Sequence, residues 1–286
     1  MWSRAYGLHQ QGKLAEALAA YDAILAGAPR HAAALHYSGV VFYQTGKLAE
    51  ALDRLRASVA IDGRDADAWS NLGLVLQAIG HRRAAVEVFE KAAQLDPKSP
   101  EILCNLASGL HTWGRHAEAE EVARRVIARD STYAKAWFIV ALALQTQGRM
   151  LESLDAATRA ASLAPDQPGY AGLRAQTEIG IGAPDKARRT LETALARHPM
   201  STPLRFELAN LLQYRLSDPV ASAAEYAHVL RVEPAHGAAL SQLTFLNGGL
   251  ADWRGRDDLV ARYRAGVAAG TPGLSPFAFL SLPSTA

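Results

Sequence analysis

Glycine recurs at a fixed interval of 34 residues in this chain, at Gly12, Gly46, Gly80, Gly114, Gly148 and Gly182. Small residues keep the same interval on both sides of it. Seven positions before each glycine stand Ala5, Gly39, Gly73, Ala107, Ala141 and Ala175, and five positions after it stand Ala17, Ala51, Ala85, Ala119, Ser153 and Ala187. A period of this length is typical of stacked supersecondary units that repeat along the chain.

The spacing inside each unit predicts a helical hairpin. Between Trp69 and Gly80, apolar residues follow one another at steps of three and four, which places them on one face of a helix. Glycine can adopt the left-handed conformation that ends a helix, so the chain turns there into a second, antiparallel helix. We expect the small residues to lie where paired helices cross closely. The larger residues at one position of the second helix should fill the space between hairpins; they are Tyr21, Leu55, Phe89 and Leu191.

Proline and hydroxyl residues mark the boundaries between units. Proline closes most of them, at Pro29, Pro97, Pro165, Pro199 and Pro234. Ser99-Pro100 and Thr202-Pro203 each place a hydroxyl before a proline, which predicts a capped helix start.

These residues resemble a known family. The segment from Asp67 to Gly73 (DAWSNLG), followed by Gly80, Ala85, Phe89, Ala92 and Pro97, is similar to a nearly complete tetratricopeptide repeat. The resemblance implies an all-α, right-handed superhelical solenoid of about seven hairpins. We place the repeats near 1–31, 32–65, 66–99, 100–133, 134–167, 168–201 and 202–236, and a helical cap and linker at 237–286.

The seventh unit departs from the pattern. Leu216 stands where glycine is expected, and Pro234 follows Pro199 by 35 residues, so we infer one inserted residue at the turn. Asp218, before Pro219, is expected to cap the second helix. Two further helices are expected near 238–247 and 256–268.

Composition limits the classes of function. The chain is 49% hydrophobic and 20% charged, with a formal net charge of +2 at pH 7, which favours a folded protein without a nucleic-acid partner. The single cysteine, Cys104, cannot form an internal disulfide. The first eleven residues lack the apolar stretch of a signal peptide, and the longest apolar run, 136–144, is far shorter than the about 20 residues of a membrane span. We therefore expect a cytoplasmic protein that does not enter a membrane.

The candidate site is a stripe of neutral polar residues. In tetratricopeptide arrays the first helix of each repeat lines the concave wall, and the resemblance places His9, Tyr43, Gln77, His111, Gln145, Ile179 and Gln213 at one position there. Such groups suit recognition of the backbone of an extended peptide. The alternative is that they are ordinary half-exposed helix positions. The predicted groove residues are His36, Tyr43, Asn71, Gln77, Asn105, His111 and Gln145.

Asn71 and Asn105 share one repeat position, which resembles the asparagine ladder of O-GlcNAc-transferase-like arrays. Only two rungs are present, because Tyr37, Ile139, Leu173 and Glu207 fill the others. A carboxylate clamp of the type that binds chaperone C-termini is not expected. The positions that would need Lys and Asn hold His36, Val40, Ser70 and Leu74.

The tail carries a second resemblance. Asp252-Trp253-Arg254, with the apolar segment containing Phe277, Phe279 and Leu280, is similar to the linker that precedes the catalytic half of bacterial SPINDLY-type glycosyltransferases, although Ala251 replaces a frequent cysteine. This resemblance implies contacts of Asp252, Trp253, Phe277, Phe279 and Leu280 with a C-terminal glycosyltransferase domain. The alternative is that the apolar tail caps the last hairpin of a free-standing adaptor.

Catalytic chemistry is not expected. Gly180-Ile-Gly182 lacks the third glycine of a dinucleotide loop and already serves as a repeat turn. The pairs His31/His36 and His111/His116 are five residues apart, which does not suit a metal site on one helical face. Cys104 lies within a first helix and is expected to be a packed residue. We predict neither cofactor nor metal, and a protein or extended peptide as partner.

Overall fold

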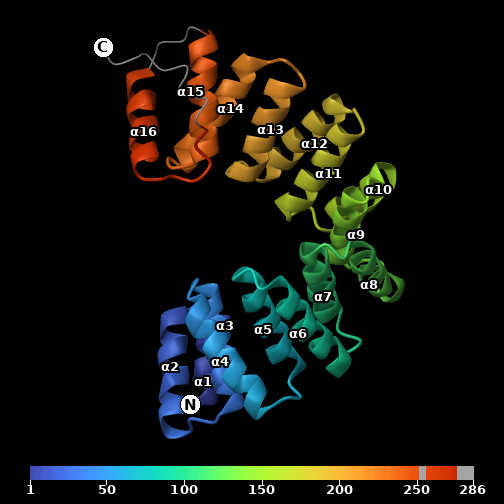
Figure 1. The fold of residues 1–286 in the computed structure, drawn as a ribbon, viewed down its shortest axis with the longest axis vertical. Coiled ribbons are helices and arrows are strands. Elements are labelled where there is room, and N and C mark those ends of the chain that lie inside the picture. Colours follow the sequence, from blue (N-terminus) through green and yellow to red (C-terminus); the bar gives the residue numbers. More distant parts are fainter. Residues whose placement is uncertain (251–255, 276–286) are drawn as a thin grey trace. The chain divides into compact units, whose positions relative to one another are not determined.

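The computed structural model describes residues 1–250 and 256–275, with the side chains of 248–250 and 256 left aside (Figure 1). Within these residues every regular element is a helix, which confirms the predicted all-α fold class. The helices are α1 (Trp2–Gln10), α2 (Leu14–Gly27), α3 (Ala32–Gln44), α4 (Leu48–Ile61), α5 (Ala66–Ala78), α6 (Arg82–Leu95), α7 (Pro100–Trp113), α8 (His116–Arg129), α9 (Ala134–Thr146), α10 (Met150–Leu163), α11 (Pro168–Gly180), α12 (Pro184–Arg197), α13 (Thr202–Tyr214), α14 (Pro219–Val232), α15 (Gly237–Leu250) and α16 (Arg256–Ala268).

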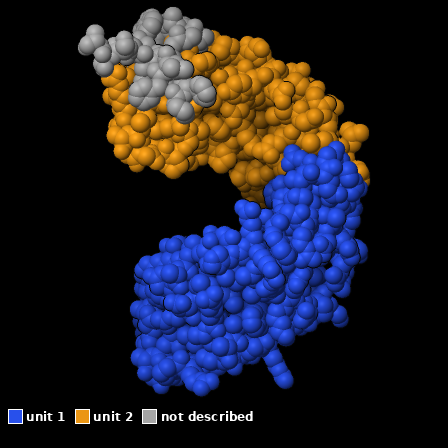
Figure 2. Space-filling model, viewed as in Figure 1, with its two compact units in different colours: residues 1–149 blue, residues 150–286 orange. Residues whose placement is uncertain are grey.

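The chain divides into two compact units, Met1–Arg149 and Met150–Ala286 (Figure 2). We call them unit 1 and unit 2. Unit 1 contains α1 to α9 and unit 2 contains α10 to α16. The division therefore falls inside the segment 134–167 that the sequence assigns to one repeat.

The glycines turn the chain between the helices of each hairpin. All six glycines of the 34-residue series have a positive φ, from +72° at Gly12 to +96° at Gly114. After α5, the amide of Gly80 donates to the carbonyl of Gln77 at 3.0 Å, and the amide of His81 donates to that of Leu76 at 2.9 Å. These bonds satisfy the last carbonyl groups of the helix while the chain reverses.

The turn of the seventh hairpin uses a different residue. Ser217, one position after the Leu216 that replaces the expected glycine, has a φ of +53°. The Asp218 carboxylate then accepts the amide of Ala221 at 3.0 Å and caps α14, as predicted. The extra residue shifts the large core side chain by one position, so that Tyr226 is fully buried in this hairpin.

The two predicted hydroxyl caps have different outcomes. Ser99 accepts the amide of Ile102 at 3.3 Å and caps α7. Thr202 is not a cap, which corrects the sequence-based expectation: it is the first residue of α13, and Ser201 precedes the helix without a side-chain cap bond. The Thr202 hydroxyl donates instead to the Glu233 carboxylate. A partner in the turn between α14 and α15 therefore replaces the local bond.

Close packing within and between hairpins explains the small residues. A Cβ placed on Gly73 in α5 would lie 2.5 Å from Cε1 of Phe89, and one placed on Gly109 in α7 would lie 2.9 Å from Cδ2 of the same ring. Phe89, fully buried in α6, therefore sits between the first helices of two neighbouring hairpins. Leu55 crowds Gly39 in the same way, at 2.8 Å.

Unit 2 ends in a packed layer. Leu259 and Tyr263 from α16 join the core formed by Tyr226 and its neighbours, and Leu274 packs against it. The amide of Ser275 donates to the Ser241 hydroxyl at 2.8 Å, which ties the chain after α16 to α15. Described residues of the tail thus cover the last hairpin.

Candidate functional site

The first helices of the hairpins in unit 1 form one continuous layer. Helix α1 packs against α3, α3 against α5, α5 against α7, and α7 against α9. We call the surface of these five helices the first-helix face. These helices carry all seven predicted groove residues: His36 and Tyr43 on α3, Asn71 and Gln77 on α5, Asn105 and His111 on α7, and Gln145 on α9. Six of them are half-buried, whereas His36 is buried.

Polar side chains on this face bond to the next hairpin at a spacing of 35 residues. The pairs are His9 with Gln44 at 3.1 Å, His36 with Asn71 at 2.8 Å, Ser70 with Asn105 at 3.0 Å, and Gln77 with Thr112 at 3.0 Å. Since the repeat is 34 residues long, each bond joins one repeat position to the following position of the next repeat. Several predicted groove residues thus also hold neighbouring hairpins together.

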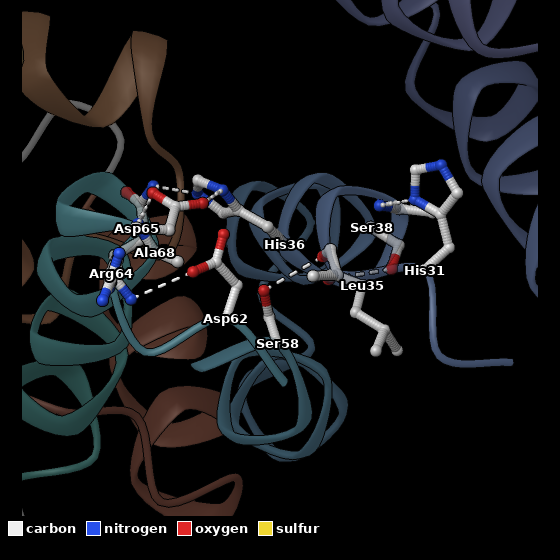
Figure 3. Close-up of polar contacts among 12 residues, drawn as sticks. His31, Leu35, His36, Ser38, Ser58, Asp62, Arg64, Asp65 and Ala68 are labelled. Atoms are coloured by element: carbon white, nitrogen blue, oxygen red, sulfur yellow. Dashed lines mark hydrogen bonds and ion pairs between the residues drawn. The ribbon is translucent and has the colours of Figure 1, made fainter. Parts of the chain in front are cut away.

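His36 is the centre of one such contact. The residue is only 3% exposed, and its Nδ1 donates to the Asp65 carboxylate at 3.1 Å (Figure 3). The Asn71 amide donates to Nε2 at 2.8 Å, which leaves the ring proton on Nδ1. Asp65 also caps α5 by accepting the amide of Ala68 at 2.9 Å. The bond from His36 is the main cause that lowers the pKa of Asp65 below its ordinary value.

This geometry changes the role of His36. A ring buried to this degree, with both nitrogens bonded, offers little surface to a peptide. It fixes the orientation of Asn71, whose carbonyl oxygen accepts no hydrogen bond within the described part of the chain.

Asn105 is bonded at both ends of its amide. It donates to the Ser70 hydroxyl, and its oxygen accepts from the Lys135 ammonium at 2.8 Å. The sequence pattern did not single out Lys135, which lies 30 residues away and brings a positive charge beside the asparagine. The two predicted rungs of the ladder are therefore not equivalent.

Gln77 and His111 complete the central part of the face. Gln77 donates its amide to Thr112, and its carbonyl oxygen accepts no bond among the described residues. His111 Nδ1 lies 3.2 Å from Nδ1 of His116. Burial, followed by the charge of His116, lowers the pKa of His111. The ring therefore stays neutral near pH 7 and can act as a neutral hydrogen-bonding group.

An aromatic cluster that the sequence pattern did not indicate lies beside His36, whose ring stacks on that of Tyr37 at 4.8 Å. The ring of Trp2 lies 5.6 Å from that of Tyr37 and 5.8 Å from that of Tyr21, and Tyr6 meets Tyr37 edge to face at 5.2 Å. Tyr6 is 37% exposed, so the cluster reaches solvent. Tyr37 occupies the repeat position that holds asparagine in two other repeats, which marked it as unusual. Nothing in the sequence indicated that Trp2 and Tyr6 of α1 would pack against it.

The reactive side chains are packed or already bonded. Burial raises the pKa of the Cys104 thiol to about 12, so it is not a nucleophile at neutral pH. His31 caps α3 through the amide of Ala34, and His36 bonds Asp65. Within the described residues, no group of three or more His, Cys, Asp or Glu is placed to hold a metal ion.

Two further expectations concern the tail of the chain and membrane-spanning helices. The predicted contact residues Asp252, Trp253, Phe277, Phe279 and Leu280 lie outside the described residues. None of the described helices has the length and apolar character required to cross a membrane.

Comparisons with known proteins agree with this geometry. Models described as TPR or tetratricopeptide repeat match residues 39–80, 66–99 and 114–168. No curated protein matches the sequence significantly.

Solved structures with low sequence identity share the fold. A tetratricopeptide repeat protein from Parabacteroides merdae is 15% identical, with a TM-score of 0.71 over 85% of this chain and 96% of its own. A chain of the APC/C hetero-tetramer Cut9–Hcn1 is 14% identical, with a TM-score of 0.69 over 85% of this chain and 48% of its own. A thermophilic TPR protein of Thermus thermophilus is 23% identical, with a TM-score of 0.54 over 71% of this chain and 99% of its own. The chain therefore contains tetratricopeptide repeats and has the fold of a tetratricopeptide array.

Proposed function

We propose that this protein binds an extended segment of a partner protein along the first-helix face of unit 1. The observation that carries the proposal is the hydrogen bonding of the side-chain amides of Asn71 and Gln77. Each uses an amide N–H to bond a neighbouring hairpin, and each keeps a carbonyl oxygen that makes no bond among the described residues. Their side chains are thus held in place before binding, which reduces the entropy lost when a ligand is captured.

The groups around them suit a peptide backbone. Carbonyl oxygens of Asn71 and Gln77 accept backbone N–H groups, while the second amide hydrogens donate to backbone carbonyls. Lys135 and Asn105 add a cationic donor beside them. The exposed edge of the aromatic cluster, at Tyr6, offers an apolar contact for a side chain of the segment.

The test uses a peptide selected from a randomised library on the immobilised chain. Its dissociation constant is then measured by fluorescence anisotropy for Gln77→Ala and Gln145→Ala on the face. The matched control is Gln94→Ala, the same chemical change at an exposed position of α6. Each face substitution should weaken binding by up to about tenfold, the loss of one hydrogen bond of about 1.4 kcal/mol, and the control should leave it unchanged. Equal effects at all three positions would refute the assignment of this face.

A more specific proposal concerns the kind of protein to which this chain belongs. We propose that the chain is the substrate-selecting part of an O-GlcNAc-transferase-like protein glycosyltransferase. The alternative is that it is a free-standing adaptor of a multiprotein complex. The support is the sequence pattern of Asp252-Trp253-Arg254 and the segment from Phe277 to Leu280. The coding frame beyond Ala286 tests it, because a two-domain nucleotide-sugar-binding half must follow. A stop codon there would support the adaptor.

A further inference from the structure

A basic groove lies in unit 2, on a surface distinct from the first-helix face of unit 1. Its volume is about 750 Å³, and α10, α11 and α12 line it. Four of the lining side chains are cationic: Arg174 from α11, and Lys186, Arg189 and Arg197 from α12. No lining residue carries a carboxylate or an aromatic ring.

A buried carboxylate holds one of these cations, Arg174, in place. Glu178 is 2% exposed and accepts Nε of Arg174 at 3.0 Å and the hydroxyl of Thr190 at 2.7 Å. The terminal nitrogens of Arg174 make no bond within the described residues, although the side chain is held at Nε. A guanidinium fixed in this way presents its outer N–H groups to an anion with little further loss of freedom.

The other three cations have no ion-pair partner in the part of the chain that the structure describes. Lys186, Arg189 and Arg197 form no ion pair with any described residue, whereas the adjacent Arg188 pairs with Glu192 at 2.7 Å. Since Glu178 forms an ion pair only with Arg174, the other three cations of the groove are not neutralised by a direct ion pair with a described residue. Like charges gathered along one wall repel one another, so an anion in the groove lowers the electrostatic free energy.

The spacing of these cations indicates the shape of the anion. Lys186, Arg189 and Arg197 recur at helical intervals on one side of α12, and the first and last are eleven residues apart. That distance is about 16 Å along the helix axis, the length of about five residues of extended chain. One small anion cannot reach all three, but an extended peptide with several carboxylates can.

We infer that the basic groove between α10, α11 and α12 binds an acidic segment of a partner protein. Arg174 and Arg189 bind carboxylates, and the small residues Ala161 and Ala171 leave room for the peptide backbone. The lining offers no aromatic ring on which a base could stack, which favours a peptide over a single-stranded nucleic acid. The basic groove belongs to unit 2, whereas the peptide site proposed above belongs to unit 1.

The test measures the anisotropy of a fluorescein-labelled octaglutamate peptide at about 50 mM salt, where screening of exposed charges is moderate. Octaglutamine and an oligouridylate of the same length are the comparison probes. The groove variant carries Arg189→Gln and Arg197→Gln. The matched control carries Arg56→Gln and Arg82→Gln, two exposed arginines on second helices of unit 1, so both variants lose the same charge.

The groove variant should bind octaglutamate about tenfold more weakly than the unmodified protein, and the control should bind it within about twofold. Lys186→Glu, at an exposed position, should weaken binding to a similar extent without loss of helicity, because it also changes the charge of the groove by two units. Equal losses in both double variants, no saturable binding of octaglutamate, or tighter binding of the oligouridylate would each overturn the inference.

Discussion

Substitution of Gly73 by alanine adds one methyl group where α5 lies close against Phe89 of α6. The new Cβ would lie 2.5 Å and 2.6 Å from Cε1 and Cδ1 of Phe89, whereas carbon atoms make favourable contact at about 3.5–4.0 Å. The ring therefore has to move by about 1 Å. It has little room to do so, because Gly109 of the next hairpin lies against its other side.

The expected result follows from two opposing terms. Overpacking of a well-filled core costs about 1–3 kcal/mol, and replacing a helical glycine by alanine returns about 1 kcal/mol. Gly73→Ala should therefore destabilise the protein by up to about 2 kcal/mol. Gly7→Ala in α1, where no atom lies within 4 Å of the added Cβ, is the control and should stabilise it by up to about 1 kcal/mol.

Chemical denaturation followed by circular dichroism and tryptophan fluorescence measures both variants. Two probes are needed because repeat arrays can lose cooperativity. The decisive result is that the two substitutions change the free energy of unfolding in opposite directions. If Gly73→Ala stabilises the protein as much as Gly7→Ala, the packing of Phe89 between α5 and α7 is wrong.

Two further predictions concern titratable groups. The bond from His36 lowers the pKa of Asp65 in the folded state, so its contribution to stability is complete above the unfolded pKa of about 3.9 and is lost as the pH falls through the folded pKa. Asp65→Asn should flatten the acid limb of a plot of unfolding free energy against pH, and an unchanged limb would contradict the contact. Cys104, buried and with a pKa raised to about 12, should react with Ellman's reagent at pH 8 only after denaturant is added; rapid reaction of the native protein would contradict its burial.

The sequence predicted those parts of the fold that local chemistry controls. Turn glycines specify a positive φ at one residue, and the 34-residue period then sets where α3, α5 and α7 begin. Thr202 was misplaced because a hydroxyl before proline matches the cap pattern equally well one position into the helix. Its actual partner, Glu233, lies 31 residues away and is supplied by tertiary structure.

The candidate site was less predictable because it depends on how adjacent hairpins are offset. The repeat position of Asn71 and Asn105 suggested equivalent rungs. The one-residue offset gives them different partners, His36 for the first, and Ser70 with Lys135 for the second. The basic groove could not be predicted from the sequence, because its lining comes from three helices. Each of its arginines, taken alone, resembles a residue on a solvated helix surface.

Photo-crosslinking tests the proposed peptide site most directly. A peptide selected on the protein is synthesised with a diazirine-bearing residue, irradiated in the complex, and its adducts are located by mass spectrometry. Adducts should fall on α3, α5 and α7, near Tyr43, Gln77 and His111. Adducts confined to the second helices α4, α6 and α8, or to unit 2, would contradict the claim that the first-helix face of unit 1 holds the peptide.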